Sequence, residues 1–315
     1  MTTPTRYVLF GSGCILALGL VAGAVAYVEG GFPALARMQS APEELRYFPA
    51  SASVVAYADV HGVMTSELRQ RLREAGPPSQ GQRDFQSRTG IDIEKDVDRI
   101  VVCLVPGPGE PEGLMIVTGR FEPQGLEALA EAHGGTAEEY HGVRVVTRPM
   151  SDRDLAMAFL EPGVIAIGST PTVRQAIDAP VGGDVTSNEP LMDLMGEIQS
   201  GSNAWLIARL DDPASLAWLP DRVQSQVPAL DAFALAGRVN GGVSGRITAE
   251  ARDEQAGQDL SDVVQGFLAL ARMQGGNRPE LTPMLEGLQL TRTGRRVTLS
   301  FDLSPNVVEM AIPQR

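Results

Sequence analysis

The feature that most constrains this chain is an uncharged apolar run near its amino terminus. Residues 7–28 contain no Asp, Glu, Lys or Arg and are rich in Val, Leu, Ala and Gly. A helix rises about 1.5 Å per residue, so a run of this length crosses the ~30 Å hydrocarbon core of a bilayer. We therefore predict that residues 1–28 form a signal anchor or transmembrane helix. The rest of the chain is then held at a membrane or exported through one.

Two interpretations of this run stay open, an uncleaved anchor and a cleaved signal peptide. Residues 24–26 and 34–36 both satisfy the small-x-small rule for signal peptidase. Signal peptides usually have apolar segments of about 7–15 residues, and this run is longer, which favours the anchor. The short end with Arg6 then stays in the cytoplasm, and the protein is a single-pass inner-membrane protein with its bulk in the periplasm. A cleaved signal would make it a secreted periplasmic protein.

Charge excludes several classes of partner and chemistry. The formal net charge of −13 repels phosphate backbones, so nucleic acid is not expected as a partner. Lys95 is the only lysine and does not lie in a GxxxxGK[ST] motif, which excludes Schiff-base chemistry and a Walker phosphate loop. The expected partners are the membrane, through the apolar helix, and a protein or envelope component. The oligomeric state stays open.

The first part of the exported body has the pattern of an α+β module. Residues 29–44 are predicted to be a stalk, and residues 45–180 the first module. Strands are predicted at residues 54–60, 100–105, 114–121 and 143–147, with helices after Ser66 and from Pro123. A hairpin at residues 155–160 and 164–167 and a helix capped by Ser169 or Thr170 complete it. The order β-α-β-β-α-β is that of a split βαβ, or ferredoxin-like, unit.

The same order of elements returns after a connecting segment at residues 181–203. The second module is predicted at residues 204–315. Its strands are expected at residues 204–210, 231–239, 243–251, 288–292 and 297–303, and its helices at residues 213–223 and 255–274. The predicted fold class is therefore α+β, with two tandem split-βαβ modules of antiparallel sheet after one amino-terminal apolar helix. The repeat depends on element order alone.

Several short stretches carry a resemblance to a protein family. They are Tyr-Phe-Pro-Ala-Ser-Ala-Ser-Val-Val-Ala-Tyr at residues 47–57, Thr-Gly-Ile-Asp at 89–92, Gly-Arg-Phe at 119–121, Tyr-His-Gly at 140–142 and Asn-Ala-Trp at 203–205. The chain resembles an uncharacterised, acidobacteria-type group of bacterial proteins with one amino-terminal apolar segment or signal and a repeated α+β body. None of these stretches is a catalytic motif, so the resemblance implies a fold and an extracytoplasmic location but no activity.

The two cysteines do not indicate a catalytic thiol or a disulfide. One, Cys14, lies in the apolar run, which leaves Cys103 alone in the exported body. Cys103 is surrounded by Val101, Val102 and Leu104 in a strand pattern. A buried, inert thiol is therefore the prediction.

Two groups of potential metal ligands can be weighed. Asp92, Glu94, Asp96 and Asp98 alternate as in a calcium loop, but Val97 and Cys103 stand where an EF-hand needs Gly and Glu. Carboxylates alternating into a strand are typical of a solvated edge. The three histidines, His61, His133 and His141, have no HExxH or His-x-His spacing. A helix end explains His133, and a turn explains His141.

Two further motifs fail their chemical requirements. Residues 242–246, Gly-Val-Ser-Gly-Arg, miss the last glycine of a nucleophile elbow and lie in a predicted hairpin strand. Residues 107–113 are rich in glycine, but their prolines lack N–H donors and their glutamates repel phosphate, so a hairpin loop is predicted. No catalytic, cofactor-binding or metal-binding residue is therefore assigned.

Three functions follow in decreasing order of support. The first is a non-enzymatic, membrane-anchored extracytoplasmic protein that acts through contacts with a protein or an envelope component. The second is a binder or carrier of an apolar ligand, with Trp205, Trp218 and residues 191–195 as a possible lining, although core packing explains these residues better. The third is a hydrolase whose active-site residues are scattered along the chain.

Overall fold

The computed structural model describes residues 41–75, 80–106, 111–149, 154–210, 230–275 and 282–311. The predicted anchor at residues 1–28, the stalk up to residue 40, the loop at residues 107–110 and the helix at residues 213–223 lie outside these ranges. In the described part of the chain, no helix is both long enough and apolar enough to cross a membrane.

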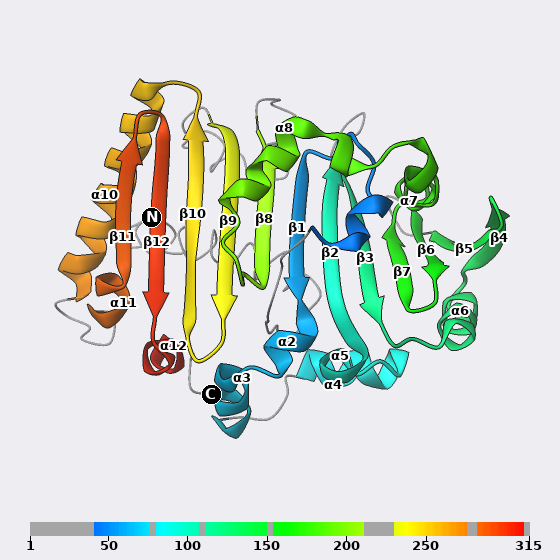
Figure 1. Ribbon diagram of the computed structural model, residues 1–315. Coiled ribbons are helices and arrows are strands. Elements are labelled where there is room, and N and C mark those ends of the chain that lie inside the picture. Colours follow the sequence, from blue (N-terminus) through cyan, green and yellow to red (C-terminus); the bar gives the residue numbers. More distant parts are fainter. Residues whose placement is uncertain are drawn as a thin grey trace, which may run out of the picture.

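The described strands form one sheet of 12 strands (Figure 1). The spatial order is β11-β12-β10-β9-β8-β1-β2-β3-β7-β6-β5-β4, and every neighbouring pair is antiparallel. The strands are β1 (Val54–Asp59), β2 (Val97–Val105), β3 (Glu112–Gly119), β4 (Thr136–Tyr140), β5 (Val143–Pro149), β6 (Asp154–Glu161), β7 (Val164–Gly168), β8 (Ala204–Arg209), β9 (Leu230–Val239), β10 (Val243–Ala251), β11 (Leu288–Thr293) and β12 (Arg296–Leu303).

Helices connect these strands and cover both faces of the sheet. The α-helices are α2 (Val60–Met64), α3 (Glu67–Ala75), α4 (Gln80–Thr89), α5 (Ile93–Asp96), α6 (Pro123–Ala132), α7 (Thr170–Gly182), α8 (Glu189–Met192), α10 (Glu254–Gly275), α11 (Thr282–Glu286) and α12 (Pro305–Ala311). Short 3-10 helices lie at η1 (Glu43–Tyr47), η2 (Val185–Ser187) and η3 (Asp193–Glu197).

The predicted fold class, two split-βαβ modules, is wrong. In a split βαβ unit, the two strands joined by a helical crossover are parallel and are separated by a third strand that lies between them. Here β1, β2 and β3 are neighbours in chain order and are antiparallel. The two halves also share one sheet, because β1 pairs with β8 along its length, with Tyr57 opposite Trp205 and Val55 opposite Ile207.

The two halves of the sheet nevertheless follow the same strand order outward from the β1–β8 pair. In the first half, β1 is followed by the hairpin β2–β3 and then by β7 and β6; in the second, β8 is followed by β9–β10 and then by β12 and β11. The hairpin β4–β5 lies beyond this shared order at one end of the sheet. It has no counterpart among the described residues of the second half.

Most strand and hairpin positions agree with the sequence pattern. The β6–β7 turn places Gly163 at φ 77° and the β11–β12 turn places Gly294 at φ 59°, in the left-handed region that glycine adopts without steric conflict. Several elements differ from the prediction, among them β4 and η1. Strand β4, Thr-Ala-Glu-Glu-Tyr, lacks an alternating apolar face, and η1 begins inside the predicted stalk, where Glu44 is already buried.

The largest core cluster lies on the side of the sheet that carries Trp205, here called the Trp205 face. Trp205 is fully buried and stacks on Tyr57, with ring centroids 5.6 Å apart. Apolar residues of α7 close this cluster, including Val173. The predicted connecting segment also belongs to it, since Val185 and Leu191 are fully buried there. Residues 181–203 are therefore part of the core as well as a connection between the halves.

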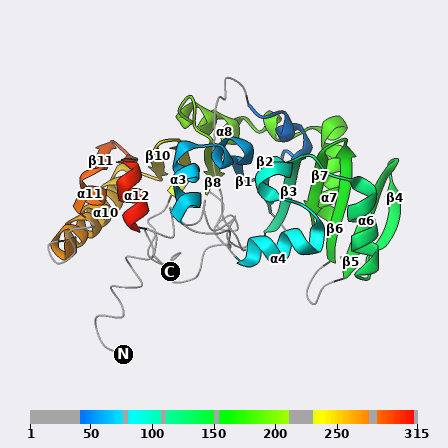
Figure 2. The same cartoon turned by 90° about the horizontal axis from the view of Figure 1, so that it is seen from below.

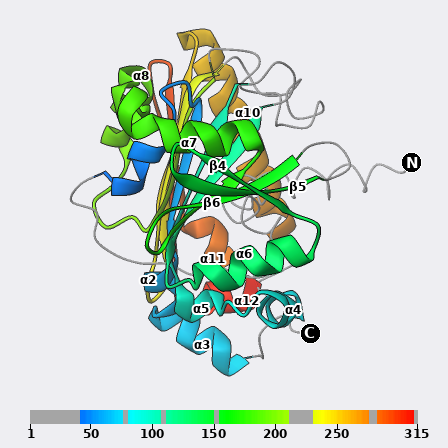
Figure 3. The ribbon, with the colours of Figure 1, turned by 90° about the vertical axis from the view of Figure 1, so that its right-hand side faces the viewer.

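The opposite side of the sheet, here called the Leu206 face, carries two smaller clusters. One joins Val54, Ala208 and Ala251 to Leu260 of α10. The other joins Val117 and Ile100 to residues of α2 and α5. Figures 2 and 3 show the resulting arrangement, with α8 and α10 on opposite sides of the sheet.

The position of Cys103 gives a first testable prediction. Its side chain is fully buried on β2, as the sequence pattern predicts, and burial raises the pKa of the thiol. A thiol that is both inaccessible and protonated reacts slowly. We expect a maleimide reagent to label Cys103 in the native protein at least tenfold more slowly than in urea. Equal rates in both conditions would contradict a packed position for this residue.

Candidate polar docking site at the end of the sheet

The hairpin β4–β5 is closed by a two-residue turn. His141 has φ 49° and Gly142 has φ 81°, the pair of positive values required by the tight turn that matches strand twist. His141 is the only non-glycine residue with positive φ among those described. Its predicted position in a turn is therefore confirmed, and the turn sets the register in which Tyr140 faces Val143.

Helix α7 presents a polar stripe toward this hairpin. Ser169 caps the helix by accepting a hydrogen bond from the Thr172 N–H, as the sequence predicts. Residues four apart lie on the same side of a helix. Thr170, Arg174 and Asp178 follow this spacing and lie on the Trp205 face next to β4 and β5.

Five side chains join the hairpin to α7. The Arg174 guanidinium binds the Glu138 carboxylate at 2.6 Å and lies over the Tyr140 ring, 5.0 Å from its centroid. The Tyr140 hydroxyl donates to Asp178 Oδ2 at 2.8 Å, and His141 Nδ1 lies 3.0 Å from Asp178 Oδ1. The Tyr140 and His141 rings stack with centroids 4.2 Å apart. These contacts hold the outer hairpin in one position relative to the body.

The hydrogen bonds of this cluster shift the pKa values of two of its groups. The hydrogen bond to Asp178 raises the pKa of the Tyr140 hydroxyl, because the phenolate could not donate it. The hydrogen bond to Glu138 raises the pKa of Arg174. The Nε atom of Arg174 is buried and has no hydrogen-bond partner in the described part of the chain.

An open pocket of about 250 Å³ lies beside this cluster. Its lining is polar and comes from β4, β5, β6 and α7: Thr136, Glu138, Thr147, Asp154, Thr170 and Arg174. Glu138 is neutralised by Arg174, whereas Asp154 makes no ion pair with any described residue. The pocket can therefore hydrogen-bond a polar group through three hydroxyls and attract a cation through the Asp154 carboxylate.

Within the described part of the chain, this arrangement does not form a catalytic triad. The His141–Asp178 pair resembles the base and orienting group of a hydrolase, which also needs a nucleophile within hydrogen-bond reach of the imidazole. The polar and ring contacts of His141 are with Asp178 and Tyr140.

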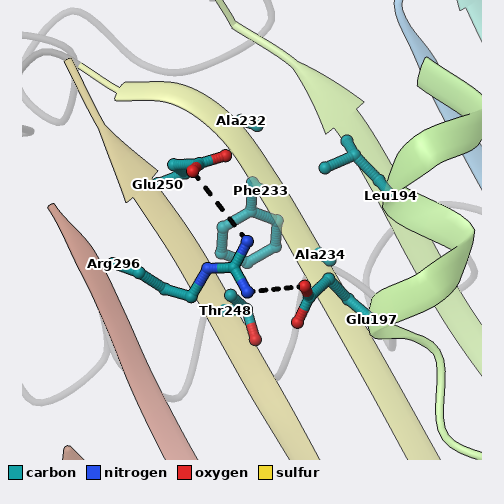
Figure 4. A pocket seen from close by; sticks show the side chains of 8 residues that line it. All are labelled: Leu194, Glu197, Ala232, Phe233, Ala234, Thr248, Glu250 and Arg296. Atoms are coloured by element: carbon teal, nitrogen blue, oxygen red, sulfur yellow. Dashed lines mark hydrogen bonds and ion pairs between the residues drawn. The ribbon is translucent and has the colours of Figure 1, made fainter. Parts of the chain in front are cut away.

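A second pocket lies where η3 meets the other half of the sheet (Figure 4). Its volume is about 10 Å³, room for about one water molecule. Arg296 reaches Glu197 at 2.8 Å and Glu250 at 3.9 Å across it, and Thr248 contributes a buried hydroxyl without a hydrogen-bond partner among described residues. The pocket is too small for a substrate and suits a bridging water.

A buried carboxylate fixes η1 to the middle of the sheet. Glu44 accepts hydrogen bonds from Arg99 Nε at 2.7 Å and from the Thr118 hydroxyl at 2.8 Å. Nearby, burial raises the pKa of Asp59, whose carboxylate caps α2. Burial also raises the pKa of Tyr57. Glu44 Oε2 is buried without a hydrogen-bond partner among the described residues, and none of the residues of this cluster lines either of the two pockets.

The carboxylate run predicted as a solvated strand edge has a different local structure. Asp92 caps the short helix α5 by accepting from the Glu94 N–H, and its other oxygen binds Lys95 at 2.6 Å. Glu94 pairs with Arg69. The first three carboxylates therefore belong to a capped helical turn, and only Asp98 lies in strand β2. Local side-chain to backbone hydrogen bonds favoured the turn over an extended segment.

The three histidines lie on separate elements. His61 is in α2, His133 caps the carboxyl end of α6 with its ring against the Leu129 carbonyl, and His141 is in the β4–β5 turn. Within the described ranges, no three His, Cys, Asp or Glu side chains come together where they could hold a metal ion.

The remaining sequence candidates lie in structural positions. Residues 243–246 of the incomplete nucleophile elbow are in strand β10, after the predicted β9–β10 turn. Trp205 and Leu191 are fully buried, and Met192, Leu194 and Met195 pack against the same core. Trp218 and residues 107–110 lie outside the described residues.

Sequence reasoning missed the residues of the docking site. Tyr140 and His141 were noticed only as part of a turn, and Arg174, Asp178 and Asp154 were not noticed at all. One signal was available, the spacing of Thr170, Arg174 and Asp178 along a helix with its apolar residues on another side. No local pattern indicated that β4 would lie opposite this stripe.

The fold and the site define an α+β protein with one antiparallel sheet and an open polar pocket beside an edge strand. No protein-family model matches the chain, and no curated protein matches it. Among solved structures, crystal form III of TP0453 has a TM-score of 0.49 at 11% identity, covering 86% of this chain and 99% of that chain. Crystal form I of TP0453 has a TM-score of 0.46 at 12% identity, covering 87% and 98%.

Proposed function

We propose that this chain is a non-enzymatic extracytoplasmic protein, anchored at a membrane by residues 1–28, that acts by contact with a protein or envelope component. The observation that carries the proposal is the β4 end of the sheet. There an exposed edge strand, a hairpin fixed to α7 and an open polar pocket occur together. An open, preorganised polar surface suits a partner that stays outside the body.

The lining residues first considered for the apolar-ligand alternative lie in the core wherever the structure describes them. Trp205 and Leu191 are inaccessible, and the methionines of residues 191–195 pack on the core. A ligand would have to displace packed side chains to reach them, which costs the contacts that stabilise the fold. No observation on the described residues favours this alternative over the contact function.

Reporter fusions test the location. Alkaline phosphatase is active only outside the cytoplasm, so a fusion after Arg315 is expected to be active while a cytoplasm-dependent reporter there stays dark. The opposite pattern would overturn an extracytoplasmic body. Recovery of the protein from the soluble periplasm, with residue 27 as its amino terminus, would show that the apolar run is a cleaved signal peptide and not an anchor.

Site-specific photo-crosslinking tests the contact. A photoreactive amino acid at Ala137, exposed on β4, is expected to crosslink a distinct partner in cells that make the protein naturally. The matched control is the same group at Thr291, which is exposed on β11 at the other end of the sheet. Equal yields and products at both positions, or none at Ala137, would contradict a specific contact at this end.

A further inference from the structure

The outer side of β4 is open to another strand. β4 is the last strand of the sheet and pairs with β5 alone among the described strands (Figure 1). Four of its residues are exposed. Such an edge presents unpaired backbone N–H and C=O groups that can pair with an extended segment from another chain.

The polar pocket lies where an added strand would place its side chains. Alternate residues of a strand point to the same face. Thr136 and Glu138 of β4 line the pocket on the Trp205 face, so the side chains that an added strand directs to that face would lie next to it. In strand addition, backbone pairing supplies affinity and such pockets supply specificity.

The charges at this edge favour a basic segment. Asp154 in the pocket and Glu139 on the opposite face make no ion pair with described residues. Arg144, opposite Glu139 in the register, is held instead by Glu127 and Glu131 of α6, at 3.0 and 2.5 Å. Two carboxylates without an ion-pair partner among the described residues therefore lie at this end of the sheet, Glu139 on β4 itself and Asp154 two strands further in, on β6.

The same charges disfavour a second copy of the chain. Antiparallel pairing of β4 with its own copy would bring Glu138 and Glu139 of each chain close to those of the other. Like charges on facing strands are destabilising. Charge therefore disfavours pairing of β4 with a second copy and favours pairing with a segment of opposite charge.

We infer that β4 binds a basic, extended polypeptide segment by strand addition, with an arginine or lysine side chain entering the pocket at Asp154. This inference rests on the contact function proposed above and names its partner class. The hairpin needs no rearrangement, because the Tyr140–Asp178 and Arg174–Glu138 bonds already hold it. Preorganisation of this kind removes an ordering cost from binding.

The test uses the full chain in detergent and a fluorescent nine-residue peptide of alternating threonine and arginine. Two peptides of equal length serve as controls, one with glutamate for arginine and one with prolines for the threonines, which keeps the charge but removes backbone donors. We expect binding of the threonine–arginine peptide to be at least tenfold tighter than binding of either control. Slower hydrogen exchange of the amides of residues 136–140 should accompany it.

Matched variants distinguish binding of the peptide at the pocket from nonspecific attraction of a basic peptide to an acidic protein. Asp154→Asn is expected to weaken binding at least fivefold, whereas Asp302→Asn, at an exposed carboxylate on β12, leaves it unchanged. Equal effects of the two variants, or equal binding of the proline peptide, would overturn the inference. Crosslinking of a partner at Ala137 without peptide binding would retain the contact function and reject strand addition, and crosslinking to a second copy would reject the basic partner.

Discussion

Replacing Trp205 by alanine is expected to lower the free energy of unfolding by about 3–5 kcal/mol. Trp205 is fully buried, stacks on Tyr57 of the neighbouring strand and lies at the pair of strands that joins the two halves. Its removal leaves a cavity in the core of the Trp205 face, where the two halves join. Urea unfolding followed by circular dichroism measures the loss.

A conservative variant serves as the control for this prediction. Trp205→Phe keeps an aromatic ring against Tyr57 and removes less volume, so it is expected to destabilise clearly less than the alanine variant. A loss below about 1 kcal/mol for Trp205→Ala would mean that the ring is not packed at the junction.

Separating the two halves is expected to abolish cooperative folding of each. A fragment of residues 200–315 would expose the edge of β8 and the Trp205 side chain, because β8 lies between β1 and β9 in the sheet. A fragment of residues 45–180 would lack Val185 and Leu191, both fully buried in the shared core. Exposed apolar strand edges also favour aggregation.

Thermal unfolding of the fragments, alone and co-expressed, measures this dependence. We expect no sharp transition for either fragment and partial recovery for the co-expressed pair, which lacks residues 181–199. Extending the first fragment to residue 199 restores the missing segment and is expected to sharpen the transition of the pair. Separate sharp transitions in the isolated fragments would show that the halves are independent modules after all.

At the candidate site, some structural features could be predicted from the sequence and others could not. The cap at Ser169 and the turn at residues 141–142 could be predicted, because capping and left-handed turns depend on neighbouring residues. The strand between Gly135 and His141 could not, because Glu138 and Glu139 interrupt the apolar alternation. Its pairing with β5 and the ion pair of Glu138 with Arg174 stabilise it. A strand of this kind is stabilised by the elements packed beside it, and its own sequence does not indicate it.

By itself the sequence determined where most strands and some of the helices begin and end, and that Cys103 would be buried. Periodic apolar side chains, capping residues and glycines with positive φ act over a few residues, so they can be recognised locally. Only the tertiary structure decided that β1 pairs with β8 and that residues 181–203 complete one core. Backbone hydrogen bonds between strands are the same for every sequence, and the choice of partner depends on side chains far apart in the chain, here Tyr57 and Trp205.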